Sequence, residues 1–582
     1  MDKTKKTRQT FLEGSFVLLI AIAIAKVLGA IFRIPLTNLL SSRGMGYYAT
    51  AYDLFLPIYT VAMAGFPVAV SRLVAERAAK GRYKDVKKIL KVSLITLLIT
   101  GTVCFFVMLL LAVLFTGNTA FTVFGKRISL HIFSKGVFPG ILAIAPSIIF
   151  CAVLSAYRGF FEGLGDMRPT GVSQVIEALG KLGFGLFFAY LILSKTGSYS
   201  LAAAGALLGV TLGCAAGTVY LIIKHKRFSK ENAFPYSEDE TEDTKKQILK
   251  ALAIIAIPIV LGSFVTNVTS LIDVMMVQKR LTSAIQKSPE FFESTYKAFI
   301  TAERGMAARS GAGYSVLKDL PNSLYGCHRG FAFSIFNLVP MITTSLGISA
   351  IPVLATAFTT HDQKNVKSNI QTMIKTAAII ALPCGMGIIA VPSGILNLLF
   401  DDTVSIAVAE YNLRILGIAA IFAGISVPLV NMLQAIGKER IPLINIAIGA
   451  AIKIILNYVL IGTPYINIKG VPIGTCAFYA FVCISNLLCL IKYCGVKIDF
   501  VSVIIKPLGA AALCGAAAYF TSVLLAKTYI DVNVQALISI AAGVVVYLLF
   551  IALFKVLGRE DVLTLPAGEK VYSALKRLKI VK

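Results

Sequence analysis

The sequence predicts an all-α membrane protein with about fourteen transmembrane helices, arranged as two six-helix lobes related by an internal repeat plus two C-terminal helices. Of the 582 residues, 57% are hydrophobic and only 15% are charged. The mean hydropathy of +0.80 exceeds that of soluble globular domains. The apolar residues form continuous runs rather than the alternating strands of about ten residues that an outer-membrane barrel requires.

Each expected helix is an apolar run of about 20 residues or more, the length that crosses the hydrocarbon core. Short turns of charged residues, Gly and Pro separate the runs. The expected helices are residues 14–40, 48–78, 88–116, 133–160, 169–194, 199–224, 247–278, 323–358, 366–399, 404–436, 441–462, 470–492, 501–526 and 532–557.

Two similar turns indicate the internal repeat. Residues 163–169 read GLGDMRP, and residues 434–442 read QAIGKERIP, so in both a Gly ends one helix and a Pro begins the next. Pro57 and Pro340 occupy equivalent places in the two halves. The expected parts are an N-lobe at 1–224, a cytoplasmic linker at 225–246, a C-lobe at 247–494 with an outer loop at 279–322, a helix pair within 495–558, and a cytoplasmic tail at 559–582.

The formal net charge of +27 is compatible with nucleic-acid binding only if the basic residues form one surface. Instead they lie in alternate connections between the apolar runs, with clusters at residues 3–8, 72–91, 224–250 and 555–582. Basic residues concentrate on the cytoplasmic side of membrane proteins. We therefore expect no nucleic-acid partner, and a multi-pass cytoplasmic-membrane protein with both termini inside.

Residues for catalysis or metal binding are not grouped in the sequence. The ten Cys lie mostly in apolar segments without a C-x-x-C pair, and the four His have no metal-ligand spacing, so neither a disulfide framework nor a metal site is expected. No phosphate-binding G-x-x-x-x-G-K-[ST] loop occurs. The sequence predicts no cofactor and no enzymatic activity.

Charges at membrane depth are the strongest functional indications. A charged side chain there costs at least about 2.5 to 3.5 kcal/mol, so it needs a partner or a watery cavity. Lys26 and Arg33 are seven residues apart and share one helix face. They predict a cationic cavity lining, although Arg33 could also snorkel to an interface. Asp53 is the candidate to balance either cation.

Four later segments carry further polar residues. Gln174, Glu177 and Lys181 share a face of the helix at 169–194, where Glu177 and Lys181 line a cavity or form an i, i+4 ion pair. A polar stripe with four-residue steps runs along the helix at 441–462. The remaining candidates for substrate binding are Asp273, Arg329, Lys453 and Asn457.

Several of these segments resemble one family. They are residues 25–29 with Arg33, residues 65–67 (GFP), residues 157–163 (YRGFFEG), and residues 169–177, which include SQVIE. Together they resemble the polysaccharide-biosynthesis and lipid II flippase branch of the multidrug/oligosaccharidyl-lipid/polysaccharide exporter superfamily, in particular its MurJ-like and stage V sporulation protein B-like members.

The resemblance implies a flippase that exports an undecaprenyl-pyrophosphate-linked cell-wall precursor, lipid II or a related lipid-linked saccharide, by alternating access. It implies a role in peptidoglycan or polysaccharide biosynthesis, cell shape or sporulation. Lys26 matches a basic cavity position of the family, Arg33 lies one residue from a second, and Arg329 is a weaker match to a basic residue of the eighth helix. The family's basic position in the second helix has no counterpart in residues 54–58. The last two helices match a pair that holds a polyprenyl tail. The implied partners are the lipid-linked substrate, membrane lipids and a coupling ion, and the chain is expected to be a monomer.

Two other functions remain open from the sequence. A drug or cation antiporter of the same fold would carry uncompensated acids in its cavity, whereas this sequence places mainly bases there. A membrane-embedded glycosyltransferase or polymerase would need acid/base residues, typically in an outer loop, and residues 279–322 offer no convincing set.

Overall fold

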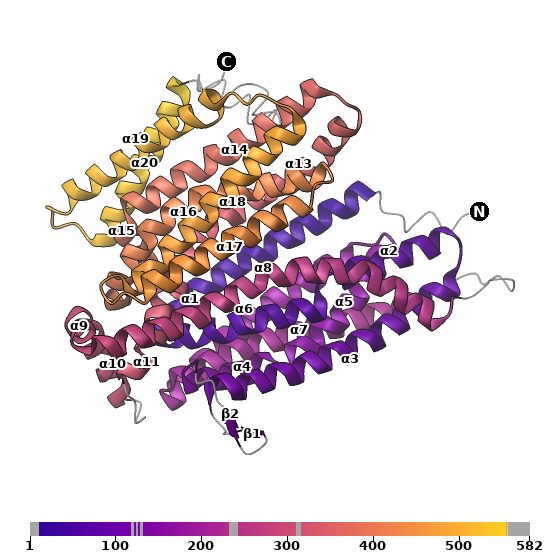
Figure 1. Cartoon of the computed structure of the whole chain (residues 1–582), viewed down its shortest axis with the longest axis horizontal. Helices are drawn as coiled ribbons and strands as arrows, with labels where there is room; N and C mark the ends of the chain where they lie inside the picture. Colours follow the sequence, from indigo (N-terminus) through magenta and orange to yellow (C-terminus); the bar gives the residue numbers. More distant parts are fainter. Residues whose placement is uncertain are drawn as a thin grey trace. The chain divides into compact units, whose positions relative to one another are not determined.

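A computed structural model describes residues 11–117, 121–123, 126–128, 132–231, 243–309, 316–554 and 556. These residues are almost entirely helical, which confirms the predicted fold class (Figure 1). One small antiparallel sheet joins β1 (Phe121–Val123) and β2 (Lys126–Ile128). By its internal contacts the chain divides into two compact units, the first formed by Met1–Lys279 with Ile300–Gly326 and the second by Arg280–Phe299 with Cys327–Lys582.

The first unit contains the N-terminal helices and most of α8 and α10, whose residues 280–287 and 297–299 belong to the second unit. Its elements are α1 (Phe11–Met63), α2 (Phe66–Ala79), α3 (Tyr83–Thr116), η2 (Lys135–Val137), α4 (Phe138–Ile144), α5 (Ser147–Gly163), α6 (Arg168–Thr196), α7 (Tyr199–Glu231), α8 (Lys245–Lys287), α10 (Lys297–Arg309) and α11 (Val316–Gly326).

The second unit contains the remaining helices. Its elements are α9 (Pro289–Thr295), η3 (Cys327–Ala332), α12 (Phe333–Phe336), α13 (Leu338–Thr359), α14 (Gln363–Ala390), α15 (Pro392–Leu399), α16 (Thr403–Ala435), α17 (Arg440–Ile461), η4 (Asn467–Lys469), α18 (Gly470–Cys494), η5 (Val501–Ile505), α19 (Lys506–Leu525) and α20 (Val532–Leu553).

Twelve helical stretches among the described residues are long and apolar enough to cross a membrane. The predicted number of fourteen is therefore not confirmed. One reason is that Ile20–Ala79 counts as a single stretch of 60 residues. Within it Ser41 has a φ of 52° and breaks the helical conformation of α1, at the point where the sequence predicts the end of the first helix.

The predicted outer loop at 279–322 is largely helical over its described residues. The apolar run ends near residue 278, but α8 continues to Lys287, and α9, α10 and α11 follow. A tertiary contact supports the extension of α8, because the guanidinium of Arg280 lies 4.0 Å from the ring centroid of Tyr458 and donates to its backbone carbonyl at 3.0 Å. The hydropathy of the sequence cannot predict this tertiary contact, so the extension of α8 was missed.

The two turns that indicate an internal repeat have the same backbone geometry. Gly165, between α5 and α6, has a φ of 82°, and Gly437, between α16 and α17, has a φ of 73°. Glycine adopts this left-handed conformation without steric cost. The division into two repeat-related lobes at residues 225–246 stays a prediction.

The basic residues 3–8, the acidic run 238–240 and the tail 559–582 lie outside the described residues.

Small residues bring α6 and α7 close together. A Cβ atom on Gly209 of α7 would lie 2.3 Å from the Cα of Gly185 in α6, and one on Gly213 would lie 2.6 Å from the backbone oxygen of Glu177. Such close approach is typical of small residues between membrane helices. It brings α7 directly against the backbone of α6 at Glu177 and Gly185.

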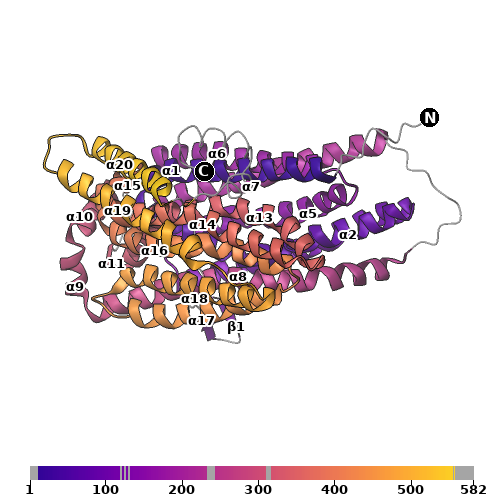
Figure 2. The ribbon, with the colours of Figure 1, turned by 90° about the horizontal axis from the view of Figure 1, so that it is seen from above.

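In the second unit, α16 packs against α13, α14 and α18. The last two helices, α19 and α20, lie side by side in both views and contact α14 and α15 respectively (Figures 1 and 2). Both helices keep large apolar side chains exposed, among them Phe520, Leu524, Val545 and Leu549. This exposure fits helices that face lipid.

An ion-pair cluster holds the start of α8 to α2 and α3. The carboxylate of Asp243 accepts from Arg77 at 2.8 Å and from Arg82 at 2.9 Å. The backbone N–H of Asp243 donates to Asp85, which also pairs with Arg82 at 2.5 Å. Burial alone would raise the pKa of Asp243, but hydrogen bonds from Arg82 and Arg77 hold that pKa below its ordinary value.

The variant Asp243→Asn is expected to lower the thermal stability of the detergent-solubilised protein at neutral pH. Because the pKa of Asp243 is lower in the folded than in the unfolded protein, its ionised form stabilises the fold above the ordinary pKa of 3.8. That contribution is lost as the pH falls through the lowered value. The difference in Tm between wild type and variant should therefore shrink on acidification. The exposed Glu290→Gln at the start of α9 is the control, and an equal effect there would contradict the assignment.

Candidate functional site

The first unit contains a cavity of about 560 Å³ between helices that carry most of the predicted polar residues. Four of the ten predicted site residues line it, namely Lys26 of α1 and Gln174, Glu177 and Lys181 of α6. The other lining residues are Ile22, Ala25, Tyr52, Tyr59, Arg158, Ala178, Val210 and Cys214. The predicted shared face of α6 is thus a cavity wall.

Glu177 is paired with an arginine that the sequence analysis did not select. The Nη2 atom of Arg158 in α5 lies 2.5 Å from Oε2 of Glu177, and its Nε donates to Ser173 at 3.0 Å. The Arg158 side chain is 8% exposed and that of Glu177 is 23% exposed. In the described part of the chain, this pair replaces the i, i+4 pair of Glu177 with Lys181 that the sequence left open.

Lys181 lies against aromatic rings. Its Nζ atom is 5.1 Å from the ring centroid of Phe32 and 5.3 Å from that of Tyr52, which are cation–π distances. The cavity wall therefore holds three basic side chains, Lys26, Arg158 and Lys181, against the single carboxylate of Glu177. Subtracting one acid from three bases leaves an excess of two positive charges, which suits an anionic ligand.

Arg33 and Asp53 are not among the residues that line this cavity. The guanidinium carbon of Arg33 lies 5.8 Å from the ring centroid of Tyr48. Asp53 is buried and accepts a hydrogen bond of 2.7 Å from the hydroxyl of Tyr325 in α11. The role of Asp53 as counter-ion to Lys26 or Arg33 stays a prediction.

The other predicted site residues lie elsewhere in the chain. Asp273 is a half-buried residue of α8 in the first unit. In the second unit, the guanidinium carbon of Arg329 lies 4.4 Å from the ring centroid of Phe333. Asn457 is fully buried, and Lys453 lies one turn before it on α17. The charges of Arg329 and Lys453 both act on the buried His328, so each of these two predicted residues lies within electrostatic range of His328.

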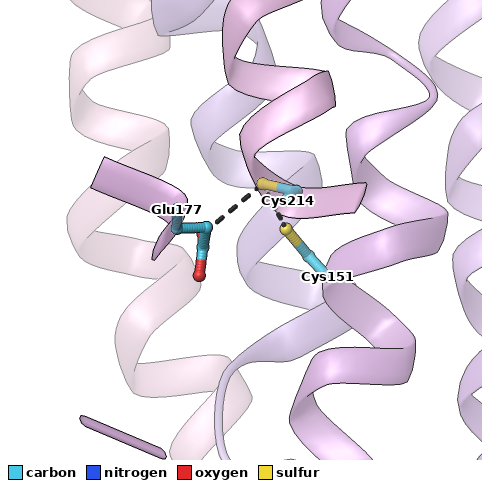
Figure 3. Close-up of side chains that lie close together, drawn as sticks. All are labelled: Cys151, Glu177 and Cys214. Atoms are coloured by element: carbon cyan, nitrogen blue, oxygen red, sulfur yellow. Dashed lines mark hydrogen bonds between the residues drawn. The ribbon is translucent and has the colours of Figure 1, made fainter. Parts of the chain in front are cut away.

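Three possible metal ligands meet beside the cavity. Cys151 of α5, Glu177 of α6 and Cys214 of α7 have ligand atoms that all lie within 4.8 Å of one another (Figure 3). The sequence analysis missed this group because its members come from three helices and show no ligand spacing. Arg158 was not selected as a site residue, although it lies in the segment at residues 157–163, because the sequence does not show which helix lies opposite Glu177.

The substitution Arg158→Met is expected to destabilise the protein by about 3 to 5 kcal/mol, because it leaves the Glu177 carboxylate without its partner. The double variant Arg158→Met with Glu177→Met should recover most of that loss, since it removes both charges. Thermal unfolding of the purified protein measures both. The exposed pair Arg414 and Glu410, 3.0 Å apart on α16, is the matched control and should change stability by less than about 1 kcal/mol. Equal losses in the single and double variants would show that Arg158 and Glu177 are not coupled.

Two family models match the chain. The polysaccharide biosynthesis protein family matches residues 11–293, and the MatE family matches residues 329–459. The chain is 24% identical over 570 residues to the stage V sporulation protein B of Bacillus subtilis (strain 168), covering 96% of this chain and 98% of that protein. It is 25% identical over 458 residues to the lipid II flippase MurJ of the same organism, covering 77% of each.

Solved structures share the fold. The inward closed conformation of a lipid II flippase MurJ matches with a TM-score of 0.60 at 16% identity, covering 93% of this chain and 98% of that one. An inward-facing multidrug resistance MATE transporter matches with a TM-score of 0.54 at 15% identity, covering 80% and 98%. These comparisons confirm the resemblance found in the sequence. Residues 11–293 thus match the polysaccharide biosynthesis protein family, and the whole chain resembles the polysaccharide-biosynthesis and lipid II flippase branch of the multidrug/oligosaccharidyl-lipid/polysaccharide exporter superfamily. Together with the twelve apolar helical stretches among the described residues, these similarities support a multi-pass membrane transporter.

Proposed function

We propose that this transporter exports an undecaprenyl-pyrophosphate-linked cell-wall precursor, lipid II or a related lipid-linked saccharide, across the cytoplasmic membrane by alternating access. The observation that carries the proposal is the excess of two positive charges on the wall of the 560 Å³ cavity. One relative is a lipid II flippase, and its name supports the same substrate class.

A pyrophosphate fits this wall chemically. Lys26 and Lys181 each offer an ammonium group, and charge-assisted hydrogen bonds from such groups to phosphate oxygens are about twice as strong as neutral ones. Gln174 can donate to a sugar or phosphate oxygen. The polyprenyl tail stays in the lipid while the polar head group crosses in the watery cavity.

A drug or cation antiporter is the second candidate, because the MatE family model matches residues 329–459. Its cavity would need an acid that is available to the cation. The cavity described here has one carboxylate, Glu177, and Arg158 already pairs with it. The charge balance therefore favours an anionic substrate.

The test is depletion of the protein in its own cells, followed by an assay of which lipid-linked precursors accumulate in the inner leaflet. We expect a pyrophosphate-linked saccharide to accumulate there. Accumulation of no such lipid, together with increased sensitivity to cationic drugs, would favour the antiporter instead.

The orientation is also part of the proposal. Basic residues predict that both termini and the linker at 225–246 face the cytoplasm. We expect a cysteine introduced by Ser237→Cys, which lies outside the described residues, to resist a membrane-impermeant thiol reagent in intact cells and to react after permeabilisation. Labelling in intact cells would reverse the orientation.

A further inference from the structure

We propose that Cys151, Glu177 and Cys214 form a binding site for a thiol-seeking divalent metal ion, with Zn²⁺ as the best fit. The sequence analysis expected no metal, and transport of a lipid-linked saccharide does not require one. The site goes beyond the proposed function, although it shares Glu177 with the cavity wall.

The distances suit tetrahedral zinc. The Sγ atoms of Cys151 and Cys214 are 3.3 Å apart, and Sγ of Cys214 is 3.4 Å from Oε1 of Glu177 (Figure 3). With zinc–sulfur bonds of about 2.3 Å and zinc–oxygen bonds of about 2.1 Å, tetrahedral geometry requires roughly 3.8 Å between sulfurs and roughly 3.6 Å from sulfur to oxygen. The two observed distances are a few tenths of an ångström shorter than these values, and the ligand atoms of Cys151 and Glu177 lie within 4.8 Å of each other. Side-chain rotations that move the ligand atoms by up to about one ångström would reach the tetrahedral geometry.

The carboxylate already has the supporting contacts of a metal ligand. Oε1 of Glu177 faces Cys214, while Oε2 is held by Arg158, whose Nε in turn donates to Ser173. Carboxylates that bind metals are usually oriented by such hydrogen bonds from a second layer of residues. The close approach of Gly213 to the backbone of Glu177 brings α7, and with it Cys214, next to this oxygen.

With the metal bound, the charges balance when both cysteines bind it as thiolates. Each thiol loses its proton as its sulfur bonds to the metal, so binding of one Zn²⁺ releases two protons. Two thiolates, one carboxylate, Zn²⁺ and the Arg158 guanidinium then sum to zero charge. A neutral cluster is the arrangement that a site with Cys151 and Cys214 almost fully buried can tolerate.

The fourth coordination position faces the cavity. Cys214 and Glu177 both line that cavity, so water can complete the tetrahedron from there. Such a site would join α5, α6 and α7 through one ion. The bound metal should therefore stabilise the folded protein by mass action.

The experiment uses the full-length protein purified in detergent, freed of metal by a chelator and kept reduced by a phosphine. Titration with Co²⁺ is expected to give the visible bands of tetrahedral cobalt and a thiolate-to-cobalt charge-transfer band in the near ultraviolet. Both should saturate at one ion per chain and release about two protons. Zn²⁺ should abolish the bands and raise the Tm.

Matched variants assign the ligands. Cys151→Ser and Cys214→Ser should each weaken metal binding at least 10-fold and reduce the charge-transfer band, and Arg158→Lys should weaken it about 10- to 100-fold. Cys104→Ser, at a buried cysteine of α3, should behave as wild type. An unchanged charge-transfer band in the double variant Cys151→Ser with Cys214→Ser would overturn the proposal.

The wild-type protein also tests the site without any substitution. Absence of the charge-transfer band in the reduced wild type would rule the metal site out, and a Cys151–Cys214 disulfide in the oxidised protein would then identify the two thiols as a redox pair. Because no transport is measured, failure of this site leaves the proposed export function untouched, and failure of export leaves the metal site untouched.

Discussion

The substitution Lys26→Ala is expected to reduce export of the lipid-linked substrate about 10- to 100-fold while leaving the folded protein in the membrane. The ammonium of Lys26 lines the cavity, and one hydrogen bond to a charged group contributes about 1.5 to 3 kcal/mol. Lys181→Ala should have a loss of the same order. Complementation of a depleted strain, combined with quantification of the protein in membranes, measures the effect.

The control for Lys181 lies on the same helix. Lys195 is exposed in the last turn of α6, so Lys195→Ala changes the net charge of the protein by the same amount and should leave export intact. A lower abundance of the Lys26 and Lys181 variants that fully accounts for lost export would contradict a role in binding.

We also expect Arg33→Ala to abolish export, because the seven-residue spacing of Lys26 and Arg33 predicts that both line the cavity. Arg33 lies beside Tyr48 and is not among the residues that line the cavity. The Arg33→Ala variant therefore tests the sequence-based prediction separately from the observed cavity.

Hydropathy determines most of what could be predicted about the fold. Runs of apolar residues gave the helices of both units, because every backbone polar group in lipid must be satisfied within a helix. Helix ends that depend on tertiary contacts were missed. Thus α8 extends nine residues beyond the predicted end at 278, to Lys287, where Arg280 contacts Tyr458.

The candidate site could be predicted only where its residues share one helix. Helical periodicity placed Gln174, Glu177 and Lys181 on one face, and that face is a cavity wall. Periodicity says nothing about which helix lies opposite. For that reason the partner of Glu177, Arg158 of α5, and the neighbouring thiol, Cys214 of α7, could not be identified from spacing.

Export is expected to depend on the membrane potential and not directly on ATP. A pyrophosphate-linked head group carries about two negative charges, and an inside-negative potential contributes about 2.3 kcal/mol per charge per 100 mV to their outward movement. The excess of two positive charges on the cavity wall does not change the net charge moved per cycle. It determines whether the field acts on the loaded step or on the return step. If Lys26 and Lys181 neutralise the bound pyrophosphate, the loaded step is nearly electroneutral, and the field then drives the return of the empty, positively charged cavity.

Whether the charge moves with the loaded carrier or with the return of the empty cavity, a complete cycle moves the same net charge across the membrane. The dependence of export on the potential can therefore be predicted quantitatively. In proteoliposomes that hold the purified protein, a potassium gradient with valinomycin sets the potential in the absence of ATP, and the leaflet distribution of a pyrophosphate-linked lipid is measured at equilibrium. If two charges move per cycle, the distribution ratio should change about 100-fold for each 59 mV, since a tenfold change per charge corresponds to that potential. A pH gradient set by the inner and outer buffers, at the same potassium gradient, should leave the ratio unchanged unless protons are the coupling ion, in which case the slope with potential changes as well. A distribution that stays the same across a verified range of potentials would exclude electrogenic export. A requirement for ATP in the same vesicles would show that a separate ATPase supplies the energy.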